Sequence, residues 1–362
     1  DYKMATQCAS FCVARPSLHF TGGRANTGAN TFGKQLQLVP SKGSLVLDSR
    51  RRQLVVEAAT ERSGDEGFIW KGGGSGLAEV WEAPGMYVEA PKGSGVEWFF
   101  LDVGSKNSKS PPILLLHGLP AYSFMWRDVL PILTSANRRC IAVDLPGFGN
   151  STMMQVGAGF DYTYEEYVKS MGSMIAQLEL TATGPIDVVG QGLLGGTVAA
   201  LWAGRNPALV RKLTLMNTPL DEKSAGEIPG ALKGLTGMLA AINCQNPLNV
   251  VGKPIEASGP YSLGVEAQAA YMAPTLKDGN AGFIAIAVVK EIKKSGPKAV
   301  REAMKLLAEN GTEVDVIWGA ADTWLGSKPP PLSGLKAEVK TVEGAGHFAA
   351  EDWAEKVANA LL

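Results

Sequence analysis

The 362-residue sequence is poor in features that would mark several classes of protein. Its four cysteines show no spacing typical of a zinc site or a disulfide framework, so a reducing compartment fits. The formal net charge of −1 argues against a nucleic-acid-binding protein, whose domain is usually strongly basic. No apolar run approaches the roughly 20 residues that cross a bilayer, and residues 281–289 are the longest candidate. These absences leave a globular protein of one large domain or two small ones.

The N-terminal region lacks acidic residues. Residues 1–3 precede the first methionine, and we interpret them as the remnant of an expression tag. Residues 4–47 contain no Asp or Glu but several Arg, Lys, Ser and Thr residues, a composition typical of an organelle transit peptide. We therefore predict a plastid transit peptide over residues 4–58 and a location in the chloroplast, with the mitochondrion as second choice. A disordered cytosolic tail is the alternative.

Short apolar segments alternate with helical patterns after a Gly- and Pro-rich segment, residues 59–94, which we expect to be an irregular lead-in. The predicted strands are residues 95–103, 113–116, 140–143, 186–189, 213–216 and 314–318. The predicted helices are residues 164–178, 193–205 and 349–362. This alternation indicates an α/β protein with a mostly parallel sheet that is covered by helices on both faces.

A long segment between residues 217 and 313 interrupts the alternation. It is rich in Gly, Pro and helix-like patterns, and it contains no clear strand. We predict a helical cap over residues 220–300, inserted into a core formed by residues 95–219 and 301–362. Such a cap would lie above the carboxyl ends of the strands, where open α/β sheets bind their ligands.

Motifs follow the predicted strands in a recognisable order. They are HGLP at residues 117–120 with Trp126 and Arg127 after it, DLPGFGNS at 144–151, VGQGLLGG at 189–196, GAAD at 319–322 and GAGH at 344–347. Together they resemble the α/β-hydrolase superfamily over roughly residues 95–362. The first motif is similar to that of the epoxide hydrolase and haloalkane dehalogenase branch. With its leader, the chain resembles plastid α/β-hydrolase-like proteins of photosynthetic eukaryotes.

This resemblance implies the α/β-hydrolase fold and a catalytic triad in the chain order nucleophile, acid, histidine. Asp322 falls at the position of the acid and His347 at that of the histidine, which would act as general base. Leu119 and Leu193 fall at the two positions whose backbone N–H groups form an oxyanion hole. The alternative is that both Asp322 and His347 are ordinary turn residues.

Gly192 occupies the position of the nucleophile. Glycine has no side chain, so no covalent ester can form there. A register shifted by one or two residues offers only Gln191, Leu193 or Leu194, none of which is a nucleophile. The motif therefore predicts a degenerate nucleophile position.

Two further features of the resemblance concern the substrate. Leu119 lacks the polar side chain that binds halide near this position in dehalogenases, which argues against dehalogenation. Tyr261 and Tyr271 lie in the predicted cap, where tyrosines protonate the ring in epoxide hydrolases. Without an Asp nucleophile that reaction has no first step, so we expect the two tyrosines to line a substrate pocket or to pack within the cap.

Three hypotheses for the function follow. The first is a pseudo-hydrolase, without a cofactor or metal, that binds a small apolar molecule or a protein partner. The second is an enzyme of the lyase or cofactor-free oxygenase type, which uses the His347–Asp322 pair without a covalent intermediate. The third is an ester or lipid hydrolase with a nucleophile recruited from the cap or from Ser123. The fold alone does not decide between them.

Overall fold

The computed structural model describes residues 85–332 and 334–362. The predicted tag remnant, residues 1–3, the predicted transit peptide, residues 4–58, and most of the lead-in lie outside these residues. The last part of the lead-in forms strand β1, Met86–Glu89, although an irregular segment was expected. It becomes a strand because the turn after it folds it back antiparallel onto the next strand, β2.

An eight-stranded sheet forms the centre of the described residues. Its strands are β1, β2 (Glu97–Val103), β3 (Ile113–Leu116), β4 (Cys140–Val143), β5 (Ile186–Gln191), β6 (Val210–Met216), β7 (Val314–Gly319) and β8 (Ala337–Val342). The order is β1-β2-β4-β3-β5-β6-β7-β8; β2 pairs antiparallel with β1 and β4, and all other neighbouring strands are parallel. Strands β3, β4, β5 and β7 are buried along their whole length, as strands covered on both faces are. The predicted mostly parallel sheet is confirmed.

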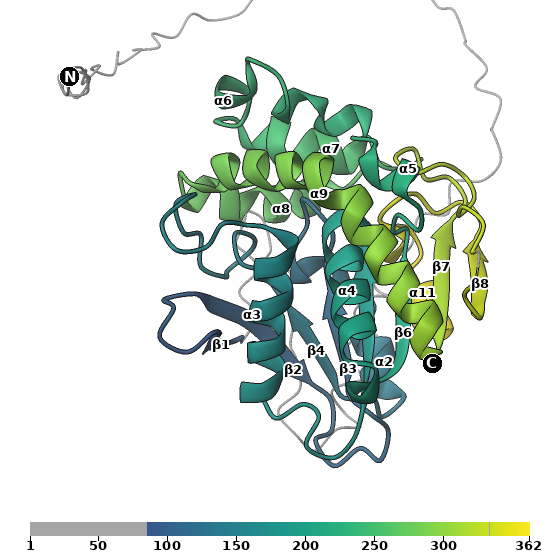
Figure 1. Cartoon of the computed structure of the whole chain (residues 1–362). Helices are drawn as coiled ribbons and strands as arrows, with labels where there is room; N and C mark the ends of the chain where they lie inside the picture. The colour runs from purple at the N-terminus through teal and green to yellow at the C-terminus, as the bar shows by residue number, and fades with distance from the viewer. Residues whose placement is uncertain (1–84, 333) are drawn as a thin grey trace, which may run out of the picture. The chain divides into compact units, whose positions relative to one another are not determined.

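Helices cover the sheet (Figure 1). Those of the core are α2 (Leu130–Ser135), α3 (Tyr164–Gln177), α4 (Thr197–Arg205), α10 (Ala349–Asp352) and α11 (Ala354–Leu361). The last predicted helix, residues 349–362, is divided at Trp353, whose backbone is not helical, with φ −143° and ψ 60°. The helix predicted over residues 193–205 begins as a π-helical turn, Gly192–Gly196.

The segment between β6 and β7 is helical, and the described residues contain no strand there. Its elements are α5 (Glu222–Gly226), the 3₁₀ helix η4 (Gly230–Leu235), α6 (Ala240–Asn243), the π-helical turn η5 (Leu248–Gly252), α7 (Lys253–Glu256), α8 (Val265–Lys277) and α9 (Ala281–Asn310). Helix α9 has 30 residues and continues past residue 300, the predicted end of the cap, to pack against α4. No helix in the described parts of the chain is long and apolar enough to span a membrane.

Candidate functional site

The residues predicted at the site meet at one edge of the sheet. Gly192 follows β5, Asp322 follows β7 and His347 follows β8. These strands are parallel and lie side by side with β6 between β5 and β7, so the loops after them gather at the same edge. This edge is where ligands bind in open α/β sheets.

His347 and Asp322 form a buried pair. Nδ1 of His347 lies 2.9 Å from Oδ2 of Asp322, and the two residues are 0% and 5% exposed. Burial raises the pKa of Asp322, but the charge of His347 and hydrogen bonds from His347, Leu325 and Asn217 outweigh it and hold the pKa below its usual range. The carboxylate can accept a hydrogen bond from Nδ1–H of His347, and in the tautomer with its proton on Nδ1 the Nε2 atom is an acceptor.

Asn217, which the sequence analysis did not single out, holds Asp322 in place. Its Nδ2 donates to Oδ2 of Asp322 at 2.7 Å, and its Oδ1 accepts from the N–H of Gly319 at 2.9 Å. Asn217 is the first residue after β6, and its backbone φ of +41° lies in the left-handed region that asparagine tolerates better than most residues. An Asn directly after a buried strand was the available signal.

The backbone at Gly192 would direct any side chain at this position towards the imidazole of His347. A Cβ built at Gly192 would lie 3.1 Å from Nε2 of His347 and 3.5 Å from Cα of Gly118. The φ of Gly192 is +71°, in the region that favours glycine. Nε2 of His347 is buried and has no hydrogen-bond partner among the described residues. The structure thus brings position 192, His347 and Asp322 together as the sequence predicts.

The two proposed oxyanion-hole residues flank the same point. Leu119 follows Gly118, and Leu193 follows Gly192; both leucines are 1% exposed. The neighbouring Gln191 donates from Nε2 to the carbonyl oxygen of His347 at 2.9 Å. A Cβ at Gly118 would lie only 1.7 Å from Oε1 of Gln191, so this packing requires glycine there. Gln191 therefore joins the loops after β3, β5 and β8, a role that the motif did not reveal.

Trp324 stacks on one face of the His347 imidazole. Its ring stacks on that of His347 with a centroid distance of 4.5 Å and an interplanar angle of 24°. The backbone N–H of Trp324 also donates to Oδ1 of Asp322 at 2.6 Å. One residue thus restrains both members of the pair, and its position two residues after Asp322 was the only signal in the sequence.

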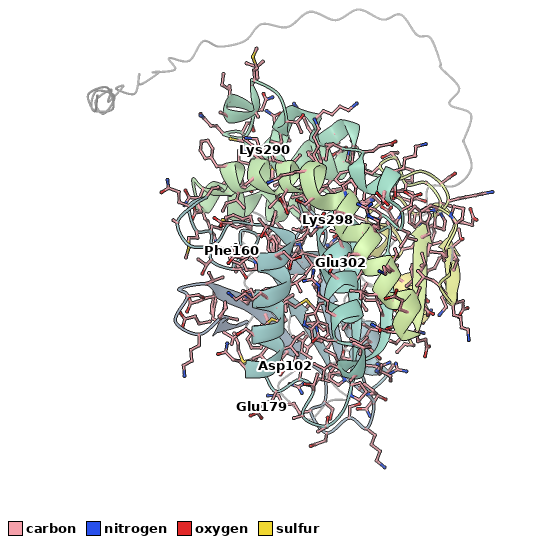
Figure 2. All side chains as sticks on the ribbon, viewed as in Figure 1. Asp102, Phe160, Glu179, Lys290, Lys298 and Glu302 are labelled. Atoms are coloured by element: carbon pink, nitrogen blue, oxygen red, sulfur yellow. The ribbon has the colours of Figure 1, made fainter. Side chains whose placement is uncertain are left out.

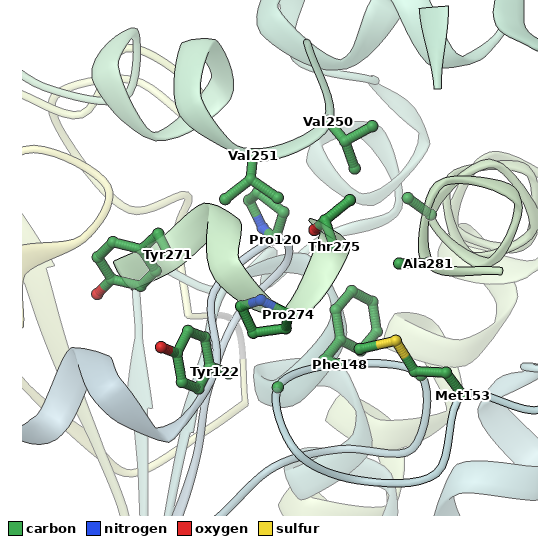
Figure 3. Close-up of a pocket in the computed structure, with 13 residues that line it drawn as sticks. Pro120, Tyr122, Phe148, Met153, Val250, Val251, Tyr271, Pro274, Thr275 and Ala281 are labelled. Carbon is green, nitrogen blue, oxygen red and sulfur yellow. The ribbon is translucent and has the colours of Figure 1, made fainter. Parts of the chain in front are cut away.

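A small apolar cavity of about 20 Å³ lies between the core loops and the cap (Figure 3). It is lined by Pro120, Tyr122, Gly147, Phe148, Gly149, Met153, Val250, Val251, Tyr271, Pro274, Thr275, Ala281 and Ala285. Such a volume holds about one water molecule. Neither Gly192 nor His347 is among the lining residues, although Pro120 follows Leu119 directly. The cap is therefore closed tightly over this end of the sheet.

The two predicted substrate-binding tyrosines occupy different environments. Tyr271 on α8 is 2% exposed, lines the cavity and donates its hydroxyl to Glu351. Tyr261 is 49% exposed, packs edge-on against Trp353 and is not among the lining residues. It lies outside the cavity because it belongs to an exposed turn between α7 and α8. Only Tyr271 is placed where a ligand in this cavity would touch it.

Ser123, considered as a relocated nucleophile, does not bond to the imidazole. Its N–H donates to Oδ1 of Asp144 at 2.7 Å, and Nε2 of His347 has no partner within the described ranges. Ser123 therefore makes no hydrogen bond to His347 here, and its role as a relocated nucleophile stays a prediction. Among residues 85–332 and 334–362, no group of three His, Cys, Asp or Glu side chains is placed so as to hold a metal ion.

His117 and Asp144 brace the surrounding loops. Nε2 of His117 accepts from the N–H of Leu145 at 2.9 Å, and Nδ1 lies 3.1 Å from the carbonyl oxygen of Gly118. Burial lowers the pKa of His117 to about 4, so the imidazole is neutral at pH 7. Asp144 accepts from the N–H groups of Ser123 and Asn150. These contacts fix the loop that carries Leu119.

Comparison with known proteins agrees with the fold described above. The family described as alpha/beta hydrolase fold matches residues 111–237. A haloalkane dehalogenase of Psychrobacter cryohalolentis is 28% identical over 76% of this chain and 90% of its own length. One of Mycolicibacterium paratuberculosis is 27% identical over 73% of this chain and 85% of its own.

Solved structures show the same fold. The crystal structure of haloalkane dehalogenase DbeA from Bradyrhizobium elkani superposes with a TM-score of 0.63 at 21% identity, covering 76% of this chain and 95% of that one. A structure titled as a putative lipase from Acinetobacter baumannii gives 0.61 at 22% identity, covering 76% and 89%. The chain therefore has the α/β-hydrolase fold, and haloalkane dehalogenases are among its homologues.

Proposed function

We propose that the protein is a non-classical α/β-hydrolase homologue that binds a small apolar molecule and performs no covalent chemistry at the turn after β5. The observation that carries this proposal is Gly192, which has no side chain although a Cβ at this position would lie 3.1 Å from Nε2 of His347. Cleavage through a covalent intermediate needs a nucleophile at this point, so the activity named in the dehalogenase relatives is not transferred to this chain. The apolar lining beneath the cap supports an apolar ligand, and a protein partner is the alternative.

Restoring the nucleophile tests the proposal. We expect a fluorophosphonate probe to leave the wild-type protein unlabelled and to label the Gly192→Ser variant, because the new hydroxyl would lie beside the His347 imidazole. Gly192→Ala carries the same backbone strain without a hydroxyl and should stay unlabelled, as should Gly192→Ser combined with His347→Ala. Labelling of the wild type that disappears in His347→Ala would overturn the proposal.

A second function has specific support in the unpartnered Nε2 of His347. With Nδ1–H donated to the ionised Asp322, this nitrogen can accept a proton from a water or from a substrate, in a lyase-like or oxygenase-like reaction. Slow hydrolysis of p-nitrophenyl acetate through an activated water would reveal such a base. We expect any turnover to be lost in His347→Gln and in Asp322→Asn; equal rates in the wild type and the double variant would exclude this function.

We also propose that the protein is imported into the chloroplast. The support is the acid-free composition of residues 4–47, which lie outside the described residues. A fluorescent protein fused behind residues 4–58 should accumulate in the plastids of a photosynthetic cell. Accumulation in mitochondria would favour the second choice, and a diffuse cytosolic signal would contradict import into either organelle.

A further inference from the structure

Three large apolar side chains are exposed together at the end of the cap. Met238 is fully exposed, Leu239 is 62% exposed and Ile242 is 67% exposed. Met238 and Leu239 lie in the turn that leads into α6 and Ile242 lies within α6, so the three are close neighbours along the chain. We call this group the cap apex. Single exposed apolar residues are common, but a contiguous group indicates an interaction surface.

The segment that contains the cap apex has lysines but no acidic residue. Residues 228–255 contain no Asp or Glu, whereas Lys233 and Lys253 are exposed. The start of α9 packs beneath this segment, because a Cβ at Gly282 would lie 2.0 Å from the carbonyl oxygen of Cys244. Figure 1 shows α6 projecting above the first half of α9.

Helix α9 extends this surface with further lysines. Phe283 is 47% exposed, and Lys290 and Lys294 follow it by seven and eleven residues, a spacing that places all three on one side of the helix. Lys290 lies about 12 Å along the helix from Gly282, and Figure 2 labels it on the cap half of α9. Neither lysine has an ion pair within the described parts of the chain. We call Lys290 and Lys294 the lysine stripe.

We propose that the cap apex and the lysine stripe dock the protein on an anionic lipid surface. Proteins that lie on membranes bury apolar side chains at the headgroup boundary, while nearby lysines are attracted to anionic lipid. A second copy of this chain fits less well, since a symmetric contact would bring two lysine-rich surfaces together. This inference is independent of the chemistry at Gly192.

Vesicle sedimentation with the full chain tests the docking. We expect more protein on phosphatidylcholine vesicles that contain phosphatidylglycerol than on phosphatidylcholine alone, with binding weakened by salt. The triple variant Met238→Ser, Leu239→Ser, Ile242→Ser should reduce the partition coefficient by roughly tenfold or more. The double variant Lys290→Glu, Lys294→Glu should remove the preference for the anionic lipid. The basic leader is common to all variants, so differences between them report the cap alone.

Matched control variants carry the same substitutions elsewhere. Lys106→Glu with Lys109→Glu changes two exposed lysines in the loop between β2 and β3. Val156→Ser with Val339→Ser changes two exposed apolar residues outside the cap. Both should bind vesicles like the wild type. Equal binding by the wild type and the triple variant would overturn the proposal. So would sedimentation velocity showing a dimer that only the triple variant loses, because the apex would then bind a second copy.

Discussion

Asn217 is the side chain on which the position of the acid depends most directly. Asn217→Gly removes its two buried hydrogen bonds and should destabilise the fold by about 2 kcal/mol. Asn217→Ala should cost about 1 kcal/mol more, because alanine is strained at φ +41°. Urea unfolding measures both values. If Asn217→Gly were as stable as the wild type, the bonds to Asp322 and Gly319 would not stabilise the site.

His117 makes stability depend on pH in a window set by its burial. Its pKa is about 4 in the folded protein and about 6.5 when exposed, so between these values the unfolded chain binds more protons. Stability is therefore lost as the pH falls through this window, by about 3 kcal/mol for this group. Unfolding of the wild type and His117→Gln at pH 4 to 7 should show a difference that grows with pH. A constant difference would contradict the neutral, buried imidazole.

At the scale of residues, the sequence predicted the members of the site better than their supports. The positions of Gly192, Asp322 and His347 follow from motifs placed after successive strands, and the geometry brings them together. Gln191 and Trp324 escaped notice because their roles arise from contacts between loops that are distant in the sequence. No local pattern specifies such contacts.

At the scale of elements, the turn after β5 has one feature that the motif did not predict. Gly192–Gly196 forms a π-helical turn, which holds one more residue than an α-helical turn. Gly195 is the residue of this turn that approaches the β3 loop. A Cβ there would lie 2.1 Å from the carbonyl oxygen of His117.

This close approach makes Gly195→Ala a sharp test of the turn. The substitution should destabilise the fold by about 3 kcal/mol, since a backbone oxygen cannot move aside without displacing the β3 loop. Gly237→Ala is the matched control, because a Cβ at Gly237 meets nothing within 4 Å. Thermal unfolding should separate the two variants clearly; similar melting temperatures would mean that the turn relaxes without cost.

Strand and helix predictions differed in accuracy for physical reasons. Buried strands such as β3 and β4 are continuous apolar runs, and their predicted limits match the structure. Strand β1 is exposed or half-buried and exists through pairing with β2, which no local pattern indicates. The cap was predicted to end at residue 300, but α9 continues to Asn310 and packs against α4.

At the scale of the whole molecule, a hydrogen bond from the cap reaches a buried ion pair of the core. Arg127 pairs with Glu351, with Nη2 2.7 Å from Oε2, and Tyr271 of the cap donates to the same carboxylate. Glu351→Gln should destabilise the protein by about 3 kcal/mol because it leaves the buried Arg127 with only the carboxylate of Asp128, 3.6 Å away, as a counter-charge. Tyr271→Phe should cost about 1 kcal/mol. Urea unfolding gives both costs, and hydrogen exchange should show faster opening of α8.

A double variant separates charge from packing in this contact. Arg127→Met combined with Glu351→Gln removes both charges and should recover much of the stability lost in Glu351→Gln alone. No recovery would mean that the side-chain shapes, rather than the unpaired charge, determine the loss.

The length of α9 has a mechanical consequence for this fold. A lid joined to its base by two loops can swing open, but here one of the two joints is an unbroken helix of 30 residues. Figure 1 shows α9 changing direction between its two halves, and Pro297 inside the helix provides a site for such a bend. Lifting the lid would require flexing this rod or detaching it from α4. We therefore expect the proposed ligand to enter through local movement of α8 and its neighbouring loops, while α9 keeps the rest of the cap in place.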